Sequence, residues 1–568
     1  MNDYTAQKIS QWKNYAKLDP LLKKELESLS PEALEDAFYE DLAFGTGGLR
    51  GIIGVGTNRM NIYIVRKTTL GFYQYLEEHY PDLKRKGVVI SYDCRHFSQT
   101  FARAASEVLA SRGVRVYLFS DLRPTPELSF AIRHLKAAGG IMITASHNPP
   151  IYNGYKVYDH EGCQLIPEFA DEVIAKVNEI TDPFAIEVVP FEQLVASGMI
   201  SLIDKTVDEV FLARVSQVPM HFNVEVNNKQ NIKIVFTPLH GTASVHMVKL
   251  LETHGFKVIP VQEQMIPDPN FSTVVSPNPE EASAFSLAIR LGEEVDADYL
   301  IATDPDADRM GIAVKTKNGY QLLTGNQTGA IMLYFLAQYK TRKKKGVVFN
   351  TIVTSNLASR IAEHFDLRLA QTLTGFKFIG TEAKRLEKTD EEFFFGFEES
   401  YGYVIEDFVR DKDALQSTLA LCYMASFYKE QGKTLLDVLN EIYEKFGYYL
   451  EDVHNITLIG YEGKKRIDAI MRYFQEARFE EFAGKKIAIM EDYDKGVRYQ
   501  EGNENPLTLP QSLVVKNIFD DGGWFVLRPS GTEPKLKIYI AIVGKTISDA
   551  KSFIDKLKQE IISIIERI

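Results

Sequence analysis

One short loop of this chain places a serine where a nucleophile could act. Residues 144–149 (TASHNP) follow the apolar run GIMI. Ser146 stands there between small residues, so its hydroxyl could be an exposed nucleophile, with His147 and backbone amides beside it to hold an anion. Ser, Asn and Pro also favour plain polar turns, which is the alternative interpretation of this segment.

A second loop carries three carboxylates at alternate positions. Asp304, Asp306 and Asp308 lie in DPDADR, between the apolar runs DYLIAT and MGIAV. Three carboxylates this close repel one another unless a cation is bound, and an all-oxygen set suits a hard ion such as Mg²⁺. A calcium EF-hand loop needs Gly at its sixth position and Glu at its twelfth, where this chain has Arg309 and Lys315. The spacing therefore predicts a site for one Mg²⁺ per chain.

Two further loops suit the binding of sugar hydroxyls and phosphate. Residues 396–403 (GFEESYGY) set carboxylates beside a hydroxyl, and both group types bind the vicinal hydroxyls of a sugar. Residues 528–535 (RPSGTEPK) place a Gly in a Ser/Thr-flanked turn with Arg and Lys at its ends, which can cradle a phosphate. A charged hairpin and an ordinary turn are the respective alternatives.

A glycine-rich loop near the start, residues 45–51 (GTGGLRG), fits neither GxGxxG nor GxxxxGK[ST]. Nucleotide binding of the Rossmann or P-loop kind therefore has no support. The glycines would let the backbone approach a ligand closely, and Arg50 could reach a phosphate.

The elements around these loops predict four domains. From residue 87 onward β-rich apolar runs alternate with helical patterns, and the alternation returns near residues 231 and 346. It favours α/β architecture, in which functional loops follow the carboxyl ends of strands. After residue 447 the pattern changes. We therefore predict three related α/β domains with mixed sheets plus a smaller C-terminal α+β domain. The expected ranges are 1–205, 206–320, 321–446 and 447–568.

Composition narrows the class of protein. The chain has 568 residues, of which 45% are hydrophobic and 25% charged, as in ordinary globular proteins. Its 65 Lys and Arg against 77 Asp and Glu give a net charge of -12, which disfavours nucleic acid as a partner. We find neither the apolar core of a signal peptide nor a run of about 18 apolar residues. A cytoplasmic protein without a membrane partner is expected. Its three cysteines, far apart in sequence, predict small buried hydrophobes rather than disulfides.

Taken together, the motifs resemble the α-D-phosphohexomutase superfamily, and within it the cytosolic branch of the phosphoglucomutase/phosphomannomutase family. The matching segments are TASHNP, DPDADR, GFEESYG and RPSGTEP, with AFGTGGLRG and NGYKVY in support, in the order found in that superfamily. They extend from residue 43 to residue 539, and their joint occurrence is highly specific.

The resemblance implies four domains around a central cleft and a reversible shift of phosphate between O1 and O6 of glucose. Ser146 would carry a phosphoryl group, and glucose 1,6-bisphosphate would be both intermediate and activator. Mg²⁺ would be held by Asp304, Asp306, Asp308 and an oxygen of phosphorylated Ser146, where it offsets charge on the transferring group.

The resemblance also assigns roles to further residues. Arg50 and Lys156 lie where groups that aid proton transfer are expected, and His147 is an alternative proton shuttle because its ordinary pKa suits that task. Arg309 would contact the phosphoryl oxygens. The remaining substrate contacts would come from Thr374, Gly375, Lys377, Glu398, Ser400, Arg528, Ser530, Gly531 and Thr532.

Several activities would use the same parts. A phosphomannomutase, a phosphopentomutase and a sugar-bisphosphate synthase share this mechanism, and the Glu-Glu-Ser sequence at 398–400 leans toward glucose because enzymes of dual mannose and glucose specificity usually have Glu-Met-Ser. A non-catalytic phosphosugar-binding relative would be expected to lack Ser146 or one of the aspartates, all of which are present. A metal-dependent phosphatase would use the same nucleophile but release phosphate to water.

Overall fold

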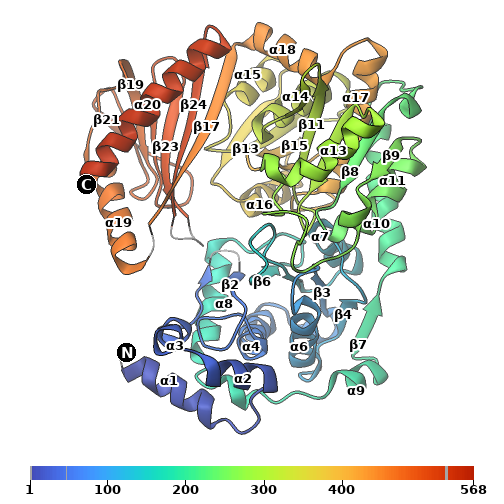
Figure 1. The fold of residues 1–568 in the computed structure, drawn as a ribbon, viewed down its shortest axis with the longest axis vertical. Helices are drawn as coiled ribbons and strands as arrows, with labels where there is room; N and C mark the ends of the chain where they lie inside the picture. The colour runs from blue at the N-terminus through green and yellow to red at the C-terminus, as the bar shows by residue number, and fades with distance from the viewer. Residues whose placement is uncertain (1–2, 46–47, 459, 531–534) are drawn as a thin grey trace.

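The computed structural model describes residues 3–45, 48–458, 460–530 and 535–568. Within these ranges the chain builds four sheets in succession (Figure 1). The first lies at the bottom of the view, the second and third at the upper right, and the fourth at the upper left. The expected three α/β units and smaller α+β unit are confirmed.

The first sheet is mixed, with strand order β1-β2-β6-β5-β3-β4-β7. Strands β3, β4, β5 and β7 run parallel, and β6 pairs antiparallel with both β2 and β5. Its strands are β1 (Phe44–Gly45), β2 (Gly48–Ile52), β3 (Val88–Tyr92), β4 (Val116–Phe119), β5 (Gly139–Ile143), β6 (Tyr152–Tyr158) and β7 (Ile200–Ile203). The accompanying helices are α1 (Asp3–Asn14), α2 (Pro20–Ser28), α3 (Pro31–Phe38), α4 (Ile62–His79), α5 (Leu83–Lys86), α6 (Ser98–Ala110), α7 (Thr125–Leu135), α8 (Pro167–Glu179) and α9 (Phe191–Ala196). Helix α10 (Lys205–Gln217) follows and packs on α7.

Helix α6 shows how the sequence pattern becomes packing. Phe101, Ala105, Val108 and Leu109 recur at helical spacing, and all four are at most 2% exposed. The stripe is buried because it faces the sheet, as the period of 3.6 residues requires.

The second and third sheets follow the same α/β plan. The second has the order β12-β11-β10-β8-β9 and the third β14-β13-β15-β16. The second comprises β8 (Lys233–Thr237), β9 (Lys257–Pro260), β10 (Tyr299–Thr303), β11 (Met310–Thr316) and β12 (Gly319–Leu322), with α11 (Met247–Thr253), α12 (Gln262–Met265) and α13 (Ser286–Val295). The third comprises β13 (Lys345–Thr351), β14 (Arg368–Thr372), β15 (Glu391–Glu398) and β16 (Gly402–Val404), with α14 (Gly325–Tyr339), α15 (Leu357–His364), α16 (Phe376–Leu386), α17 (Ala414–Glu430) and α18 (Leu435–Phe446).

The fourth sheet is antiparallel throughout its described ladders, with the order β17-β24-β23-β22-β19-β20-β21. Its strands are β17 (Tyr448–Thr457), β18 (Glu481–Phe482), β19 (Lys485–Asp492), β20 (Val497–Gln500), β21 (Asn503–Pro506), β22 (Val515–Phe519), β23 (Trp524–Pro529) and β24 (Lys535–Gly544), and its helices are α19 (Gly460–Glu476) and α20 (Ile547–Arg567). Antiparallel strands with helices on one face make this the predicted α+β unit.

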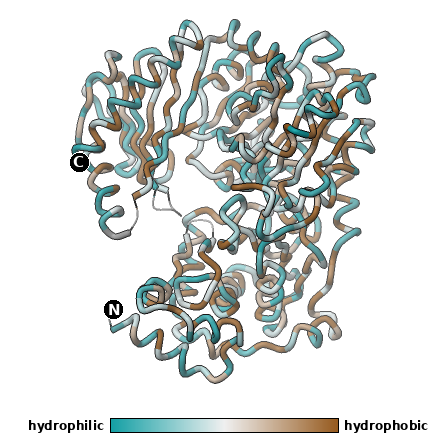
Figure 2. The backbone as a smooth tube through the Cα atoms, in the orientation of Figure 1, coloured by the Kyte–Doolittle hydropathy of each residue, from teal (hydrophilic) through white to brown (hydrophobic). Residues whose placement is uncertain are grey.

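The cores show which domains pack as one body. One cluster of buried residues draws on the first three domains, from Val89 to Tyr443, and adds Tyr449 of β17. The core of the fourth domain is separate and draws on residues from Ile467 to Ile565. A smaller cluster, which includes Ile352 and Trp524, joins the third and fourth domains. Figure 2 shows hydrophobic segments along the strands of these sheets and hydrophilic ones mainly on the outside.

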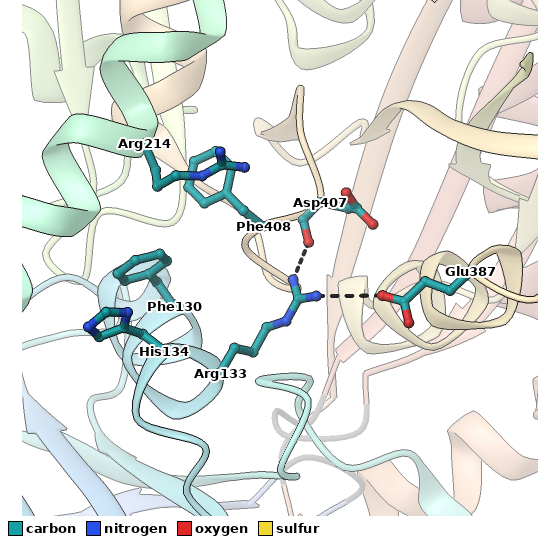
Figure 3. A pocket seen from close by; sticks show the side chains of 7 residues that line it. All are labelled: Phe130, Arg133, His134, Arg214, Glu387, Asp407 and Phe408. Carbon is teal, nitrogen blue, oxygen red and sulfur yellow. Dashed lines mark hydrogen bonds and ion pairs between the residues drawn. The ribbon is translucent and has the colours of Figure 1, made fainter. Parts of the chain in front are cut away.

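The first and third domains also meet at a polar crevice of about 590 Å³ (Figure 3). Arg133 of α7 reaches across it, donating a hydrogen bond to the Asp407 carbonyl and lying 3.5 Å from a Glu387 carboxylate oxygen. Arg214 of α10 lies over the Phe408 ring, 5.3 Å from its centroid. These contacts help to fix the third domain against the first and the second.

Two smaller expectations have clear outcomes. None of the described helices is long and apolar enough to cross a membrane. The three cysteines are unpaired, and Cys163 and Cys422 are buried as expected. Cys94 is only partly buried, so the expectation of a fully buried side chain was wrong there: it follows the end of β3, where the chain leaves the sheet.

Candidate active site

Ser146 lies directly against the aspartate loop. Its hydroxyl donates a 2.7 Å hydrogen bond to Oδ2 of Asp304, 158 residues further along the chain. The backbone of Ser146 is left-handed, with φ of 51°, a conformation that non-glycine residues adopt rarely and at a cost of about 1–3 kcal/mol. The structure therefore joins the expected nucleophile to the expected metal loop and holds it in a strained turn after β5.

His147 is the neighbour of the Ser146 hydroxyl, with Nδ1 at 3.2 Å from Oγ. Burial, together with the positive charges of Arg309 and Arg50, lowers the pKa of His147 well below its ordinary value. A neutral imidazole can accept a proton as well as donate one, so this position suits proton exchange with Ser146.

The three aspartates form a compact, buried oxygen cluster. One carboxylate oxygen from each of Asp304, Asp306 and Asp308 lies within 4.8 Å of the other two, and each residue is at most 2% exposed. The buried Oδ1 atoms of Asp306 and Asp308 have no hydrogen-bond partner among the described residues. Buried carboxylate oxygens without partners are unfavourable unless a cation takes them as ligands. The residues present therefore fit Mg²⁺.

Two lysines contact this cluster, one from the first domain and one from the third. Lys156 of β6 places Nζ 2.9 Å from Asp306 and 3.6 Å from Asp308. Lys412, in the segment before α17, places Nζ 3.0 Å from Asp308 and 3.2 Å from Asp411. Burial opposes the charged form of Lys156, but Asp306 and Asp308 outweigh it and raise its pKa.

Lys412 was missed in the sequence analysis. The signal available was the alternating charge of the RDKDA segment, immediately before a helix whose residues are mostly buried. Asp308 and Asp411 raise the pKa of Lys412 strongly, although burial alone would lower it. Such a charged run beside an apolar helix indicates ion pairs with another part of the chain.

Arg309 of the aspartate loop and Arg50 of β2 both lie near Ser146 and the aspartates. Arg309 forms an ion pair with Glu280, a second residue that the sequence analysis missed, and lies 3.8 Å from Asp308. Arg50 of β2 donates to the Asn148 side chain at 3.1 Å. Strands β2 and β6 pair side by side, so Arg50 and Lys156 approach the Ser146 loop together.

The third domain supplies the expected sugar loop. Glu398 ends β15, is 4% exposed and accepts a 2.7 Å hydrogen bond from the Gly375 amide. Burial raises the pKa of Glu398 to about 7. The Glu399 carboxylate instead accepts from the hydroxyls of Thr351 (3.0 Å) and Thr354 (3.1 Å). The two adjacent glutamates therefore have different partners.

Residues 374–377 lie beside Glu398, at the start of α16. Thr374 has a buried hydroxyl without a hydrogen-bond partner among the described residues. Burial, assisted by the charge of Arg528 from the fourth domain, lowers the pKa of Lys377 to about 8. Lys377 of the third domain and Arg528 of the fourth, either of which could bind an anion, therefore act on the same region.

The fourth-domain loop is described in part. Arg528 is the next-to-last residue of β23, and its Nη1 lies 3.5 Å from the Tyr539 hydroxyl. The Ser530 amide donates to the carbonyl of Lys535 at 2.8 Å. Ser400 follows Glu399 in the turn after β15 and is half-buried. Gly531 and Thr532 lie outside the described residues.

A second buried cluster, made of Glu127, Asp208 and His246, lies next to the aspartate loop. Thr125 at the start of α7 donates its hydroxyl to Asp306 at 2.8 Å, and two residues later Glu127 lies 3.0 Å from Nε2 of His246. Asp208 lies in the same cluster and receives two hydrogen bonds from Arg123, at 2.9 and 3.0 Å. These contacts join the first and second domains next to Asp306.

Replacing Glu127 with Gln is expected to change how stability depends on pH. Burial raises the pKa of Glu127 from 4.5 to about 7. Between these values the folded protein keeps a proton that the unfolded chain has lost, so the carboxyl group lowers stability as pH rises. Gln cannot titrate, so from pH 4.5 to pH 8 the variant should gain up to about 3 kcal/mol relative to the parent.

The measurement is the thermal unfolding midpoint of both proteins at pH 5, 6, 7 and 8. The midpoint difference should grow in favour of Glu127→Gln with increasing pH. The control is Glu363→Gln, at an exposed pair with Arg360, whose profile should parallel that of the parent. A constant difference for Glu127→Gln would contradict the raised pKa.

Comparisons with known proteins agree with this geometry. The phosphoglucomutase/phosphomannomutase families match here in order: alpha/beta/alpha domain I at residues 41–183, domain II at 209–319, domain III at 324–446 and the C-terminal domain at 484–541. A phosphoglucomutase of Staphylococcus aureus is 38% identical over 95% of this chain and 96% of its own. A phosphoglucomutase of Staphylococcus haemolyticus is 37% identical over 94% and 95%.

Solved structures show the same fold at lower identity. The parafusin phosphoglucomutase of Paramecium aligns with a TM-score of 0.68 and 19% identity, covering 93% of this chain and 96% of that one. A Thermus thermophilus protein described as a phosphomannomutase aligns with a TM-score of 0.67 and 23% identity, covering 93% and 99%. On the sequence matches, with the four-domain fold in agreement, the chain belongs to the phosphoglucomutase/phosphomannomutase family.

Proposed function

We propose that the protein is a phosphoglucomutase, an isomerase that interconverts α-D-glucose 1-phosphate and D-glucose 6-phosphate. The observation that carries this proposal is the 2.7 Å contact of the Ser146 hydroxyl with Asp304 in a buried three-aspartate cluster. The name shared by relatives 37–38% identical over almost their whole length supports glucose as the sugar. We also propose a cytoplasmic location and the domain ranges 1–205, 206–320, 321–446 and 447–568. The four sheets follow these ranges, except that β12 crosses residue 320.

In the proposed cycle, phosphorylated Ser146 gives its phosphoryl group to the O6 hydroxyl of glucose 1-phosphate. The bond from phosphorus to the Ser146 oxygen breaks, the bond to O6 forms, and the hydroxyl proton passes to a basic group. Glucose 1,6-bisphosphate then turns over in the site. Its O1 phosphoryl group passes to Ser146, and a proton returns to O1.

Three groups would move these protons. Lys156 is held protonated by two aspartates and suits the donor, and His147, with its lowered pKa, suits the acceptor. Lys412 reaches the same carboxylates from the third domain. Arg50 and Arg309 would orient the phosphoryl oxygens through their guanidinium groups.

One Mg²⁺ per chain would be held by Asp304, Asp306, Asp308 and an oxygen of phosphorylated Ser146. When bound it would neutralise charge on the phosphoryl oxygens.

Substrate recognition is assigned to the third and fourth domains. Glu398 and Ser400 would bind vicinal sugar hydroxyls, which both orientations of a turning bisphosphate present. The phosphate that is not transferred would be bound by hydroxyl, amide and cationic groups of Thr374, Gly375, Lys377, Arg528, Ser530, Gly531 and Thr532.

Replacing Glu398 with Gln is expected to lower kcat/KM for glucose 1-phosphate by about 100-fold. Its carboxylate is the proposed acceptor for sugar hydroxyls, and a hydrogen bond to a charged group contributes about 1.5–3 kcal/mol. The matched control is Glu399→Gln, because that carboxylate is already occupied by Thr351 and Thr354. Steady-state kinetics should show less than about a threefold loss for the control, and equal losses in both variants would refute the assignment of Glu398.

The sugar preference is tested by ³¹P NMR with Mg²⁺ and a trace of glucose 1,6-bisphosphate. Glucose 1-phosphate, mannose 1-phosphate and ribose 1-phosphate compete in one tube, and the glucose resonance should convert first. Earlier conversion of mannose or ribose would assign a phosphomannomutase or phosphopentomutase. Net accumulation of bisphosphate would indicate a synthase, and free phosphate a phosphatase.

A further inference from the structure

We propose that Arg95 is a positioning residue: it holds the Ser146 loop in the shape that phosphoryl transfer needs and ties that loop to the second domain. The inference rests on the proposed function, because it names what keeps the proposed nucleophile in place. Arg95 lies three residues after β3, in a segment (DCRHFS) to which the sequence analysis assigned no chemistry.

The guanidinium group of Arg95 donates hydrogen bonds along the Ser146 loop. Nη2 donates to the carbonyl oxygen of Ser146 at 2.6 Å and also to that of Asn148. Nη1 donates to the carbonyl oxygens of Pro149 (2.9 Å) and Tyr152 (3.1 Å). The side chain of Arg95 is fully buried, so these bonds are shielded from water. One planar group therefore fixes four backbone carbonyls, including that of the nucleophile.

Asp93 fixes the Arg95 side chain and the beginning of the loop together. Its Oδ2 lies 3.4 Å from Nε of Arg95 and accepts a 2.6 Å hydrogen bond from the Thr144 hydroxyl. Its Oδ1 accepts from the Ser98 hydroxyl at 2.7 Å and from the Arg95 amide at 2.9 Å. Asp93 thus balances the charge of Arg95 within the first domain. The two terminal nitrogens of the guanidinium group remain available to donate to backbone carbonyls.

Phe271 of the second domain covers the other face of the guanidinium group. The ring centroid lies 4.9 Å from the Arg95 carbon Cζ, and Phe271 is 1% exposed. Its segment is held by His240, whose Nε2 lies 2.7 Å from the Thr273 hydroxyl. Gly241, next to His240, packs closely on Pro305 of the aspartate loop. A Cβ added to Gly241 would lie only 2.4 Å from the Cα of Pro305. Arg95 is therefore coupled to both loops.

Positioning matters here because Ser146 holds a left-handed backbone. Such a conformation persists only where the surroundings determine it. Arg95 supplies that constraint with a planar fork whose donors reach four acceptors at once. Lys keeps the charge and much of the length, but its ammonium group is a single point with three donors. The substitution Arg95→Lys therefore removes the fork while it keeps a cation beside Asp93.

The first test compares Arg95→Lys with the parent. We expect kcat to fall by about 100-fold and KM for glucose 1-phosphate to change by less than threefold, because Arg95 does not touch substrate. Rapid-quench transfer of phosphate from glucose 1,6-bisphosphate to Ser146 should slow by the same factor. The matched control is Arg103→Lys, an exposed arginine that also stacks on an aromatic ring, that of Phe191 at 4.9 Å. It should transfer phosphate at the parental rate.

A second variant, Phe271→Leu, keeps the fork and removes the stacked ring. We expect transfer to Ser146 to slow by about fivefold with an unchanged KM. If Arg95→Lys does not fold, as judged by circular dichroism, this variant decides the question: an unchanged transfer rate would overturn the proposal.

The outcomes separate this inference from the proposed function. A parent protein that does not isomerise glucose phosphates would refute the proposed function itself. An active parent with an Arg95→Lys variant of equal transfer rate would refute only the positioning role. A loss confined to KM would also refute it, since it would show that Arg95 acts on substrate binding.

Discussion

Replacing Ser146 with Ala is expected to lower kcat for glucose 1-phosphate isomerisation by at least about 10⁴-fold. The hydroxyl oxygen is the only side-chain atom of this residue that can carry the phosphoryl group. Alanine has no such atom, so the covalent intermediate cannot form. Binding of glucose 6-phosphate should change by less than about threefold, because the proposed contacts with the sugar and with the phosphate that is not transferred lie on the third and fourth domains. The measurements are a coupled assay of glucose 6-phosphate formation and calorimetric titration.

A matched control is Ser120→Ala. Ser120 follows β4 of the same sheet and donates to the Asp204 carboxylate at 3.3 Å, but it is exposed. Its loss should leave kcat within twofold of the parent. Substantial activity in Ser146→Ala would place the phosphoryl carrier elsewhere, and loss of the fold would show that Ser146 has a structural role.

Removing Mg²⁺ with a chelator, or replacing Asp306 with Asn, is expected to lower kcat by about 10³-fold. Asp306 already shares Oδ2 with Thr125 and Lys156, so its unpartnered Oδ1 is the oxygen left for a cation. Losing a charged ligand weakens the site and the stabilisation of the phosphoryl charge. Readdition of Mg²⁺ should restore the chelated parent.

A readout independent of activity is the shift of the unfolding midpoint on addition of Mg²⁺. A ligand that binds only the folded protein raises that midpoint, and the stabilisation grows as RT ln(1 + L/Kd), where L is the free ligand concentration. The parent should respond and Asp306→Asn should not, whereas the control Asp296→Asn, at an exposed pair with Lys315, should behave as the parent. Full activity after complete chelation, or an equal response in both variants, would contradict a metal site at these aspartates.

The parts of the site that the sequence predicts are those coded locally. Ser146 and the three aspartates each lie in a short loop after a strand, and such loops gather at the carboxyl edge of a sheet. The apolar stripe of α6 was predicted for a similar reason, because 3.6-residue periodicity is a property of the segment alone. The structure bears out that stripe and the α/β alternation.

The parts that the sequence could not predict depend on contacts between distant segments. Lys412 meets Asp308 across 104 positions, and Arg95 meets the Ser146 loop across about 50. No local pattern encodes which cation faces which carbonyl or carboxylate. Glu398 and Glu399 are likewise indistinguishable as adjacent letters, and only their partners separate them. Helices α1–α3 were not predicted either. They share one core with α4, made of Trp12, Leu26, Phe38 and Tyr63 among others.

The most direct test of the central claim is transfer of label from glucose 1,6-[³²P]bisphosphate to the full-length protein, followed by mass spectrometry of its peptides. The account predicts stoichiometric phosphate on Ser146 that unlabelled glucose 1-phosphate removes within one turnover, with the label recovered at O6 of glucose 6-phosphate. Label that stays on the protein through many turnovers, or that lies on another residue, would contradict it.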